Sequence, residues 1–457
     1  MSSMGRPATY ASGEKSARKY RALYAEPESA LCDELRSLAI PFGHGLAIPS
    51  YGEGDGVAPG LESLRPGPRG KALIVIVVNA PANASMESRA ANAQTAARIR
   101  ADYGEGQPLG GSARLHPHPS GKILVIDRST ENPLPPGQGV GLARKIGADL
   151  LHALVDEGLI ESPWIHCSDA DAVFPEDYFE QCEEPSQEGE AALLYRFRHV
   201  AGTDSAAHEA ALRYEISLRY YVLGLRFAKS PYAFHSIGST LAIHANAYAR
   251  VRGFPRREAA EDFYLLNKLA KVGSIRPLTG RPLELSSRTS FRVPFGTGAA
   301  IRRLLEKPPA ELETYSPGVF YALGAWQSAL ELATQQPGTG DALRKAVVER
   351  AELDQRVDAA LLLRTLEARG DLQTAERALA GGGSGLRRRV LENFDGFRAL
   401  KLIHALRDAG LENIPLDAAL EEASFVSPLS ANLSPGLETL ADHLEAQEFS
   451  AGASRAG

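Results

Sequence analysis

The chain of 457 residues is poor in cysteine and carries no excess of basic charge. Its three cysteines, Cys32, Cys167 and Cys182, include no closely spaced pair, so we expect neither a disulfide framework nor a thiolate zinc site. Such sparse cysteine usage fits a reducing cytoplasm, which is the location we expect. The formal net charge of −6, from 50 basic and 56 acidic side chains, argues against a nucleic-acid-binding protein.

Long apolar runs are also missing. No segment approaches 18 uninterrupted apolar residues, and Met1 to Lys19 contain no apolar signal-peptide core. We therefore expect neither a membrane span nor a signal peptide. Hydrophobic residues make up 44% and charged residues 23% of the chain, which are values of an ordinary globular protein.

Short apolar runs alternate with helical patterns through the first part of the chain. Strands are expected at 45–49, 72–78, 122–126 and 164–167, and helices at 55–65, 86–101 and 140–156. This alternation predicts an α/β fold, with a mainly parallel sheet that is covered by helices. The Gly- and Pro-rich residues 104–121 are expected to form a long loop.

A second set of elements follows, and then the strand patterns vanish. A helix is expected from Ser205 to Phe227, a strand from Ser239 to His244 and a helix from Ala259 to Val272. After Ala299 helical patterns dominate to about Ala423, which predicts an all-helical C-terminal domain. The expected organisation is an N-terminal extension over 1–40, an α/β domain over 41–305, a helical domain over 306–445 and a flexible tail over 446–457.

Two carboxylates directly follow the fourth expected strand. Asp169 and Asp171 alternate along the chain, so on extended backbone they project to the same side. They lie at the carboxyl end of a strand, where open α/β sheets bind ligands. Hard oxygen ligands in this arrangement suit Mg²⁺ or Mn²⁺ carrying phosphate oxygens. The alternative is a solvated turn, which taken alone is the more frequent origin of such a triplet.

A second acidic pair, Glu261 and Asp262, opens the helix expected at 259–272. Asp262 is in line with Leu266 and Leu269 on the apolar stripe, so its carboxylate is expected to face a cleft. The alternative is stabilisation by the helix macrodipole, which contributes about 0.3–1 kcal/mol. The macrodipole accounts for Glu261, but it does not explain the place of Asp262 on the apolar face.

Three further segments complete a series of five motifs between about Gly45 and Gly298. They are Ile48-Pro-Ser-Tyr-Gly-Glu53, Val77-Val-Asn-Ala-Pro81 and Gly139-Val-Gly-Leu-Ala-Arg144-Lys-Ile-Gly147. With Asp169-Ala-Asp171 and Gly253-Phe-Pro…Glu261-Asp262-Phe263, their order and spacing resemble a family 2-type glycosyltransferase with the Rossmann-like GT-A fold. The chain departs from the family pattern at Gly52 and Lys145, where asparagine is usual, and at Asn79, where aspartate is usual.

The resemblance implies metal-dependent transfer of a sugar from a nucleotide-diphosphate sugar to an unidentified acceptor hydroxyl. It implies that Asp169 and Asp171 hold Mg²⁺ or Mn²⁺, and that Asp262, or else Glu261, accepts the proton of the acceptor. The residues expected to contact the donor are Pro49, Tyr51, Glu53, Asn79, Arg144, Asp169, Arg288 and Arg292.

Arg288 and Arg292 have two alternative roles. They precede Phe295-Gly-Thr-Gly298, a glycine loop that leads into a helix. Their guanidinium groups could clamp the donor diphosphate, because arginine forks fit phosphate, or the segment could simply join two domains.

Two other functions compete with sugar transfer. A sugar-nucleotide pyrophosphorylase would carry a glycine-rich loop with arginine and lysine directly after the first strand, where this chain has Pro49-Ser-Tyr-Gly-Glu53. A non-catalytic nucleotide-sugar-binding protein would bind the donor without turnover, which a Mn²⁺-dependent assay distinguishes from an enzyme.

Overall fold

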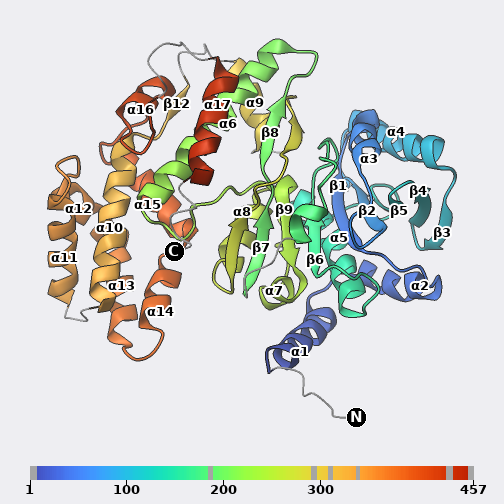
Figure 1. Cartoon of the computed structure of the whole chain (residues 1–457), viewed down its shortest axis with the longest axis horizontal. Helices are drawn as coiled ribbons and strands as arrows, with labels where there is room; N and C mark the ends of the chain where they lie inside the picture. The colour runs from blue at the N-terminus through green and yellow to red at the C-terminus, as the bar shows by residue number, and fades with distance from the viewer. Residues whose placement is uncertain are drawn as a thin grey trace. The chain divides into compact units, whose positions relative to one another are not determined.

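The computed structural model describes residues 8–183, 189–289, 296–306, 312–335, 340–428 and 436–450. The chain divides into two compact units (Figure 1). Unit 1 comprises Met1–Asp204 and Ser236–Ala299, and unit 2 comprises Ser205–His235 and Ala300–Gly457.

A nine-stranded sheet forms the centre of unit 1, in the order β10-β7-β9-β6-β1-β2-β5-β4-β3. The strands are β1 His44–Ser50, β2 Ala72–Asn79, β3 Gln107–Gly110, β4 Ala113–His118, β5 Gly121–Arg128, β6 Trp164–Cys167, β7 Glu190–Leu194, β9 Leu241–His244 and β10 Ser274–Pro277. Seven of them run in one direction, and only β4 and β9 run in the other. The prediction of a mainly parallel sheet is thereby confirmed.

The central strands are apolar because both faces of the sheet are covered. All eight residues of β2, ALIVIVVN, are buried, and so are all seven of β1. Helix α5, Gly139–Asp156, packs against β1, β2 and β6. A Cβ added at Gly147 would lie 2.9 Å from the Ala47 Cβ, so this glycine lets α5 approach β1 closely.

Unit 1 contains further helices. They are α1 Ala8–Leu23, α2 Leu31–Ser37, α3 Ala58–Ser63, α4 Met86–Tyr103, α7 Ala245–Arg250 and α8 Glu261–Leu269, with short 3-10 helices at Pro27–Ala30, Gly54–Val57, Glu180–Glu183 and Gly238–Thr240. A separate parallel pair is formed by β8, Phe197–Val200, and β11, Leu283–Ser286. The N-terminal extension predicted over 1–40 contains α1, the 3-10 helix Pro27–Ala30 and α2, so it is largely helical where it is described.

The long loop predicted for 104–121 is wrong. These residues form the β3–β4 hairpin, whose second strand pairs with β5. Pro108 lies in the edge strand β3, and Pro117 lies beyond the part of β4 that pairs with β3. Proline lacks the N–H that a central ladder needs, so at these open positions it is tolerated.

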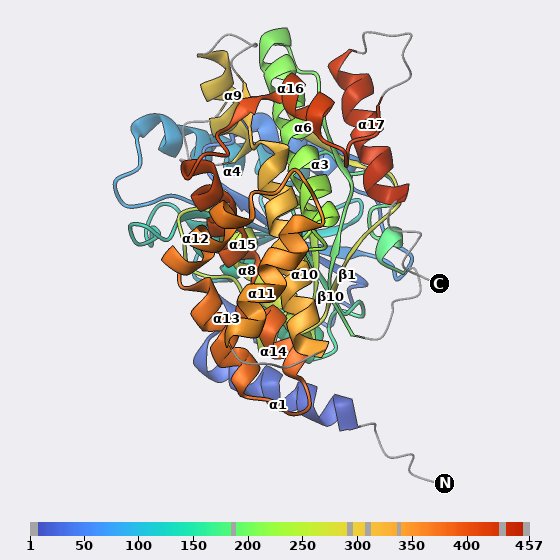
Figure 2. The same cartoon turned by 90° about the vertical axis from the view of Figure 1, so that its left-hand side faces the viewer.

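Unit 2 is built mainly of helices. They are α6 Ser205–Phe227, α9 Thr297–Leu305, α10 Pro317–Gln335, α11 Gly340–Glu352, α12 Ala359–Ala368, α13 Asp371–Ala380, α14 Leu386–Asn393, α15 Gly396–Asp408, α16 Leu416–Glu422 and α17 Leu437–Ser450, where α9 begins within unit 1. Two short strands that were not predicted, β12 Glu313–Thr314 and β13 Ile414–Pro415, pair in antiparallel fashion. Helix α10 packs against α11, α14 and α15 (Figure 2).

Helix α6 belongs to unit 2, although the predicted α/β domain of 41–305 includes it. Its Tyr220, Leu225 and Ala228, the residue just beyond it, share one apolar cluster with Phe320 and Trp326 of α10. None of the helices in the described ranges is long and apolar enough to cross a membrane.

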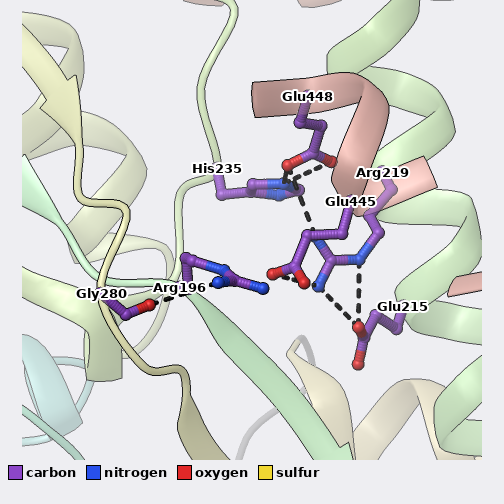
Figure 3. A network of polar contacts seen from close by, with 7 residues as sticks. All are labelled: Arg196, Glu215, Arg219, His235, Gly280, Glu445 and Glu448. Atoms are coloured by element: carbon purple, nitrogen blue, oxygen red, sulfur yellow. Dashed lines mark hydrogen bonds and ion pairs between the residues drawn. The ribbon is translucent and has the colours of Figure 1, made fainter. Parts of the chain in front are cut away.

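A buried charge cluster joins α6 to α17 (Figure 3). Arg219 of α6 donates to Glu215 at 2.7 Å and lies 3.4 Å from the carboxylates of Glu445 and Glu448. His235 Nε2 lies 3.0 Å from the Glu448 carboxylate. Residues 446–450, predicted to belong to a flexible tail, are therefore the end of α17, held in place by ion pairs.

Candidate active site

Polar side chains of unit 1 gather where β1, β2 and β6 end. The parallel registers place Ser50 of β1 opposite Val78 of β2, and Ala47 of β1 opposite Cys167 of β6. Carboxyl ends of parallel strands meet at one edge of a sheet. Asn79 is the last residue of β2, and the segments after β1 and β6 carry Glu53 and the pair Asp169 and Asp171, all of them predicted site residues.

Arg144 of α5 joins two of the predicted acids. Its Nη2 donates to Asp169 Oδ1 at 2.8 Å, and its Nε donates to Glu261 Oε1 at 3.0 Å. Its Nη1 donates to the carbonyls of Ser168 and Gly238 at 3.1 and 3.0 Å. Burial alone would lower the pKa of Arg144, but the carboxylates outweigh this and raise it, so the guanidinium stays charged. Arg144 is thus a buried cation that positions both acids.

Arg288 joins two further acids of the same edge. Its Nε donates to Asp171 Oδ2 at 2.6 Å, and its Nη2 donates to Glu53 Oε2. The Glu53 side chain is buried, whereas that of Asp171 is partly exposed. Arg292, the second predicted arginine, lies outside the described residues.

The backbone that carries Asp169 and Asp171 is fixed from several sides. Ser168 N donates to the Ala47 carbonyl at 3.1 Å, continuing the ladder of β6. Val173 and Glu284 exchange two backbone hydrogen bonds of 2.9 and 3.0 Å. A Cβ added at Gly60 would lie 2.5 Å from the Ala172 carbonyl oxygen, so α3 packs directly on this segment.

The two acids that open α8 have different surroundings. Glu261 is buried, with 4% of its surface exposed, and pairs with Arg144. Asp262 is half-buried and accepts a hydrogen bond from Phe263 N at 2.7 Å. Burial, together with the neighbouring Glu261 charge, raises the pKa of Asp262 to about 7. The apolar face of α8 is made by Leu265, Leu266 and Leu269, and Glu261 is the more buried acid, contrary to the sequence expectation.

The glycines at the start of α5 have a packing role. A Cβ added at Gly141 would lie 2.6 Å from the carbonyl oxygens of Pro255 and Arg257, and one at Gly139 would lie 3.0 Å from Glu258 Cα. The loop that leads into α8 therefore lies against the N-terminus of α5. Ala260 closes this loop in a left-handed conformation, with φ of 60°. This close packing places Arg144 and Glu261 side by side.

The remaining predicted donor contacts lie at the ends of β1 and β2. Pro49 is buried and Tyr51 is half-buried. Asn79 Nδ2 donates to the carbonyls of Ser50 and Val77 at 3.0 and 3.2 Å, which ties the two strand ends together. Asn92 of α4 was missed from the sequence, although it bonds both segments: its Oδ1 accepts from Gly52 N, and its Nδ2 donates to the Asn79 carbonyl.

Asp169 and Asp171, the partly exposed carboxylates of this edge, suit a divalent cation that is also bound by substrate phosphates. Within the described ranges, no group of three or more His, Cys, Asp or Glu residues is placed to hold a metal ion. Mg²⁺ needs no such cage, because it usually binds one or two carboxylates together with waters and substrate phosphates. The side chains of Asp169 and Asp171 are 44% and 24% exposed, so both can be reached.

No protein-family model matches the chain, and none of the curated proteins matches it. Among solved structures, the chain is similar to a mannosyltransferase from Pyrobaculum calidifontis in complex with GDP-Man and Mn²⁺. The sequence identity is 16%, the alignment covers 84% of this chain and 99% of that chain, and the TM-score is 0.32. A TM-score of this size does not define the fold or activity of the chain.

Proposed function

We propose that unit 1 is a GT-A-type catalytic domain that transfers a sugar from a nucleotide-diphosphate sugar to an acceptor hydroxyl, with Mg²⁺ or Mn²⁺ as cofactor. One observation carries the proposal. Two arginines and the carboxylates of Glu53, Asp169, Asp171 and Glu261 are linked by hydrogen bonds at the carboxyl edge of a parallel sheet. This edge is where open α/β sheets bind nucleotides.

The proposed roles follow from the surroundings of each side chain. Asp169 and Asp171 would hold the divalent cation, which neutralises charge on the leaving diphosphate when bound. Asp262 accepts the proton of the acceptor hydroxyl, because its raised pKa makes the carboxylate a better base than an exposed aspartate. Arg144 acts as a positioning residue for Asp169 and Glu261.

The test uses a panel of nucleotide sugars, with and without Mn²⁺. It measures hydrolysis of each donor to free sugar and transfer of the sugar to an acceptor. Asp171→Asn should lose more than the roughly 10–100-fold typical of outer-shell changes. Asp33→Asn is the matched control, since Asp33 lies on α2 of the same unit and its side chain is 72% exposed. Full activity of folded Asp171→Asn, or of the wild type in chelator, would contradict the proposal.

Two other outcomes would assign the chain to its competing functions. Donor binding without turnover for every acceptor tested would identify a nucleotide-sugar-binding protein. Formation of nucleotide sugar from sugar phosphate and nucleoside triphosphate, with release of pyrophosphate, would identify a pyrophosphorylase.

A further inference from the structure

Arg288 forms a hydrogen bond with Asp171, one of the two carboxylates proposed to hold the metal ion. Its Nε donates to Asp171 Oδ2 at 2.6 Å, while its Nη2 donates to Glu53. One guanidinium thus lies between two acids that come from the ends of different strands. The two acids therefore share one positive charge.

The contact is built into the backbone of unit 1. The two hydrogen bonds between Val173 and Glu284 fix the chain two residues after Asp171 to the chain four residues before Arg288. Glu284 belongs to β11, which is paired in turn with β8. On the opposite side, the Glu53 carbonyl accepts a bond from Gly56 N at 3.0 Å, within the turn that begins a 3-10 helix. All three charged side chains therefore project from anchored backbone.

The burial of Glu53 makes a cation necessary here. Its side chain is 8% exposed, and a buried carboxylate without a nearby positive charge is strongly unfavourable. The Arg288 guanidinium supplies such a charge. Asp171 has lone pairs to spare for a metal ion, but a guanidinium hydrogen-bonded to this carboxylate repels a second cation at the same group, so the two cations compete.

We propose that Arg288 is a resident counterion, which keeps the free protein from binding the divalent cation tightly and makes metal binding depend on the donor diphosphate. The inference rests on the proposed function and deepens it. With metal ion and diphosphate both bound, Asp171 would hold the metal ion, and the Arg288 guanidinium, freed from Asp171 but still beside Glu53, would be available to phosphate oxygens, for which its fork is suited. Metal and donor then bind with positive coupling, which is reciprocal by thermodynamic necessity.

The experiment measures binding of Mn²⁺ alone to the full chain by calorimetry and by electron paramagnetic resonance, without nucleotide. Arg288→Gln should bind Mn²⁺ about tenfold more tightly than wild type or better, because removal of one unit charge at contact distance is worth at least that factor. Arg288→Lys keeps the charge and should stay within about threefold of wild type.

Arg69→Gln is the matched control for the loss of one positive charge. Arg69 also bridges two carboxylates of unit 1, Glu161 and Glu183, and its side chain is 33% exposed against 37% for Arg288. Its removal should leave Mn²⁺ affinity within about twofold of wild type, since it lies away from the strand-end acids. An equal gain in Arg69→Gln and Arg288→Gln would overturn the proposal.

A double variant covers the case in which Arg288→Gln does not fold. Glu53→Gln with Arg288→Gln removes the buried carboxylate charge together with the Arg288 cation, yet it still frees Asp171, so it should also bind Mn²⁺ more tightly than wild type. Unchanged Mn²⁺ affinity in the folded variants would refute the counterion role while leaving sugar transfer by the wild type untouched. Conversely, a gain in affinity without any transfer by the wild type would refute only the proposed function.

Discussion

Glu261 and Asp262 are neighbours in sequence, yet their surroundings divide the possible roles between them. Arg144 holds the Glu261 carboxylate at 3.0 Å, so that acid is already neutralised by a buried cation. Asp262 contacts no cation among its hydrogen bonds and ion pairs in the described ranges, and its pKa is raised to about 7. These differences favour Asp262 as the base.

Asp262→Asn should therefore slow transfer by about 10²–10⁴-fold, the usual contribution of a positioned base. Binding of donor and Mn²⁺ should persist, because the variant keeps the shape of the side chain. Glu261→Gln is the comparison: it should lower stability by about 1.5–3 kcal/mol through its weakened bond to Arg144, with a smaller kinetic effect. Transfer by Asp262→Asn within a few-fold of wild type would reassign the role.

The raised pKa of Asp262 also predicts the pH dependence of the reaction. The carboxylate must be ionised to accept a proton, so kcat/KM should rise with pH up to about 7 and level off above it. An ordinary aspartate would place this limb near pH 4. The profile of kcat/KM from pH 5 to 9, measured in wild type and in Asp262→Asn, distinguishes the two, because the variant should lack the limb.

At the residue scale, the sequence indicated which polar side chains lie at the ends of strands. It did not indicate which side chains form ion pairs with them. The position directly after an apolar run was enough to predict that Asp169 and Asp171 lie at the sheet edge. The extended backbone expected for them is wrong, because Ala172 N donates to the Asp169 carbonyl and closes a turn. Their partners, Arg144 and Arg288, lie 25 and 117 positions away from them in the chain, and no local pattern encodes such a contact. Asn92 was missed for the same reason, and a donor contact for Asn79 stays a prediction.

Among the elements, α5 connects the site to the N-terminal helices. Lys145, one of the departures from the family pattern, donates to Asp149 Oδ2 at 2.8 Å and to Tyr20 Oη at 2.6 Å. Asp149 is fully buried and also accepts from Tyr248 Oη at 2.7 Å and from Glu26 N at 2.8 Å. The network ties α1 and α7 to the helix that carries Arg144.

Lys145→Met should destabilise unit 1 by about 3–5 kcal/mol, because it leaves the Asp149 carboxylate buried without its cation. The double variant Lys145→Met with Asp149→Leu should lose less than the single one, since it removes both charges. Urea unfolding of the two variants and the wild type measures the difference. A double variant as unstable as the single one would show that shape, rather than the unpaired charge, dominates at this position.

Elements with strong periodicity were predicted well, and those shaped by distant partners were not. The β-branched run at 72–78 lies in strand β2, and the apolar stripe at 140–156 lies in helix α5, as predicted. The β3–β4 hairpin was missed because its glycines and prolines are typical of loops, and only pairing with β5 makes them strands. The last turn of α17 was missed because its ion pairs join it to residues more than 200 positions earlier.

At the scale of the whole molecule, the two compact units are not consecutive segments of the chain, because each consists of two separate stretches. Unit 2 takes α6 from the middle of the chain, and two of its apolar clusters depend on that helix. One cluster contains Tyr220 and Leu225, and another contains Ile216 and Leu223 together with Leu444 of α17. We therefore propose that the helical region predicted over 306–445 needs α6 to form a complete folding unit.

A fragment covering residues 300–457 should consequently fail to unfold cooperatively, because it lacks the side chains that fill both clusters. Addition of a peptide covering 205–235 should restore a cooperative thermal transition, followed by circular dichroism. A scrambled peptide of the same composition is the control. A fragment that melts cooperatively without the peptide would show that α6 is dispensable for unit 2.

The place of α6 in the chain also sets an order of assembly during synthesis. Phe227 and Pro317 lie 90 positions apart, so at about 5–20 residues per second α6 leaves the ribosome some 5–18 s before α10 begins to emerge. Its partner α17 comes at the very end of the described chain. During this interval the apolar cluster that α6 shares with α10 cannot form. A chain released before residue 437 likewise lacks Leu444, which packs with Ile216 and Leu223 of α6.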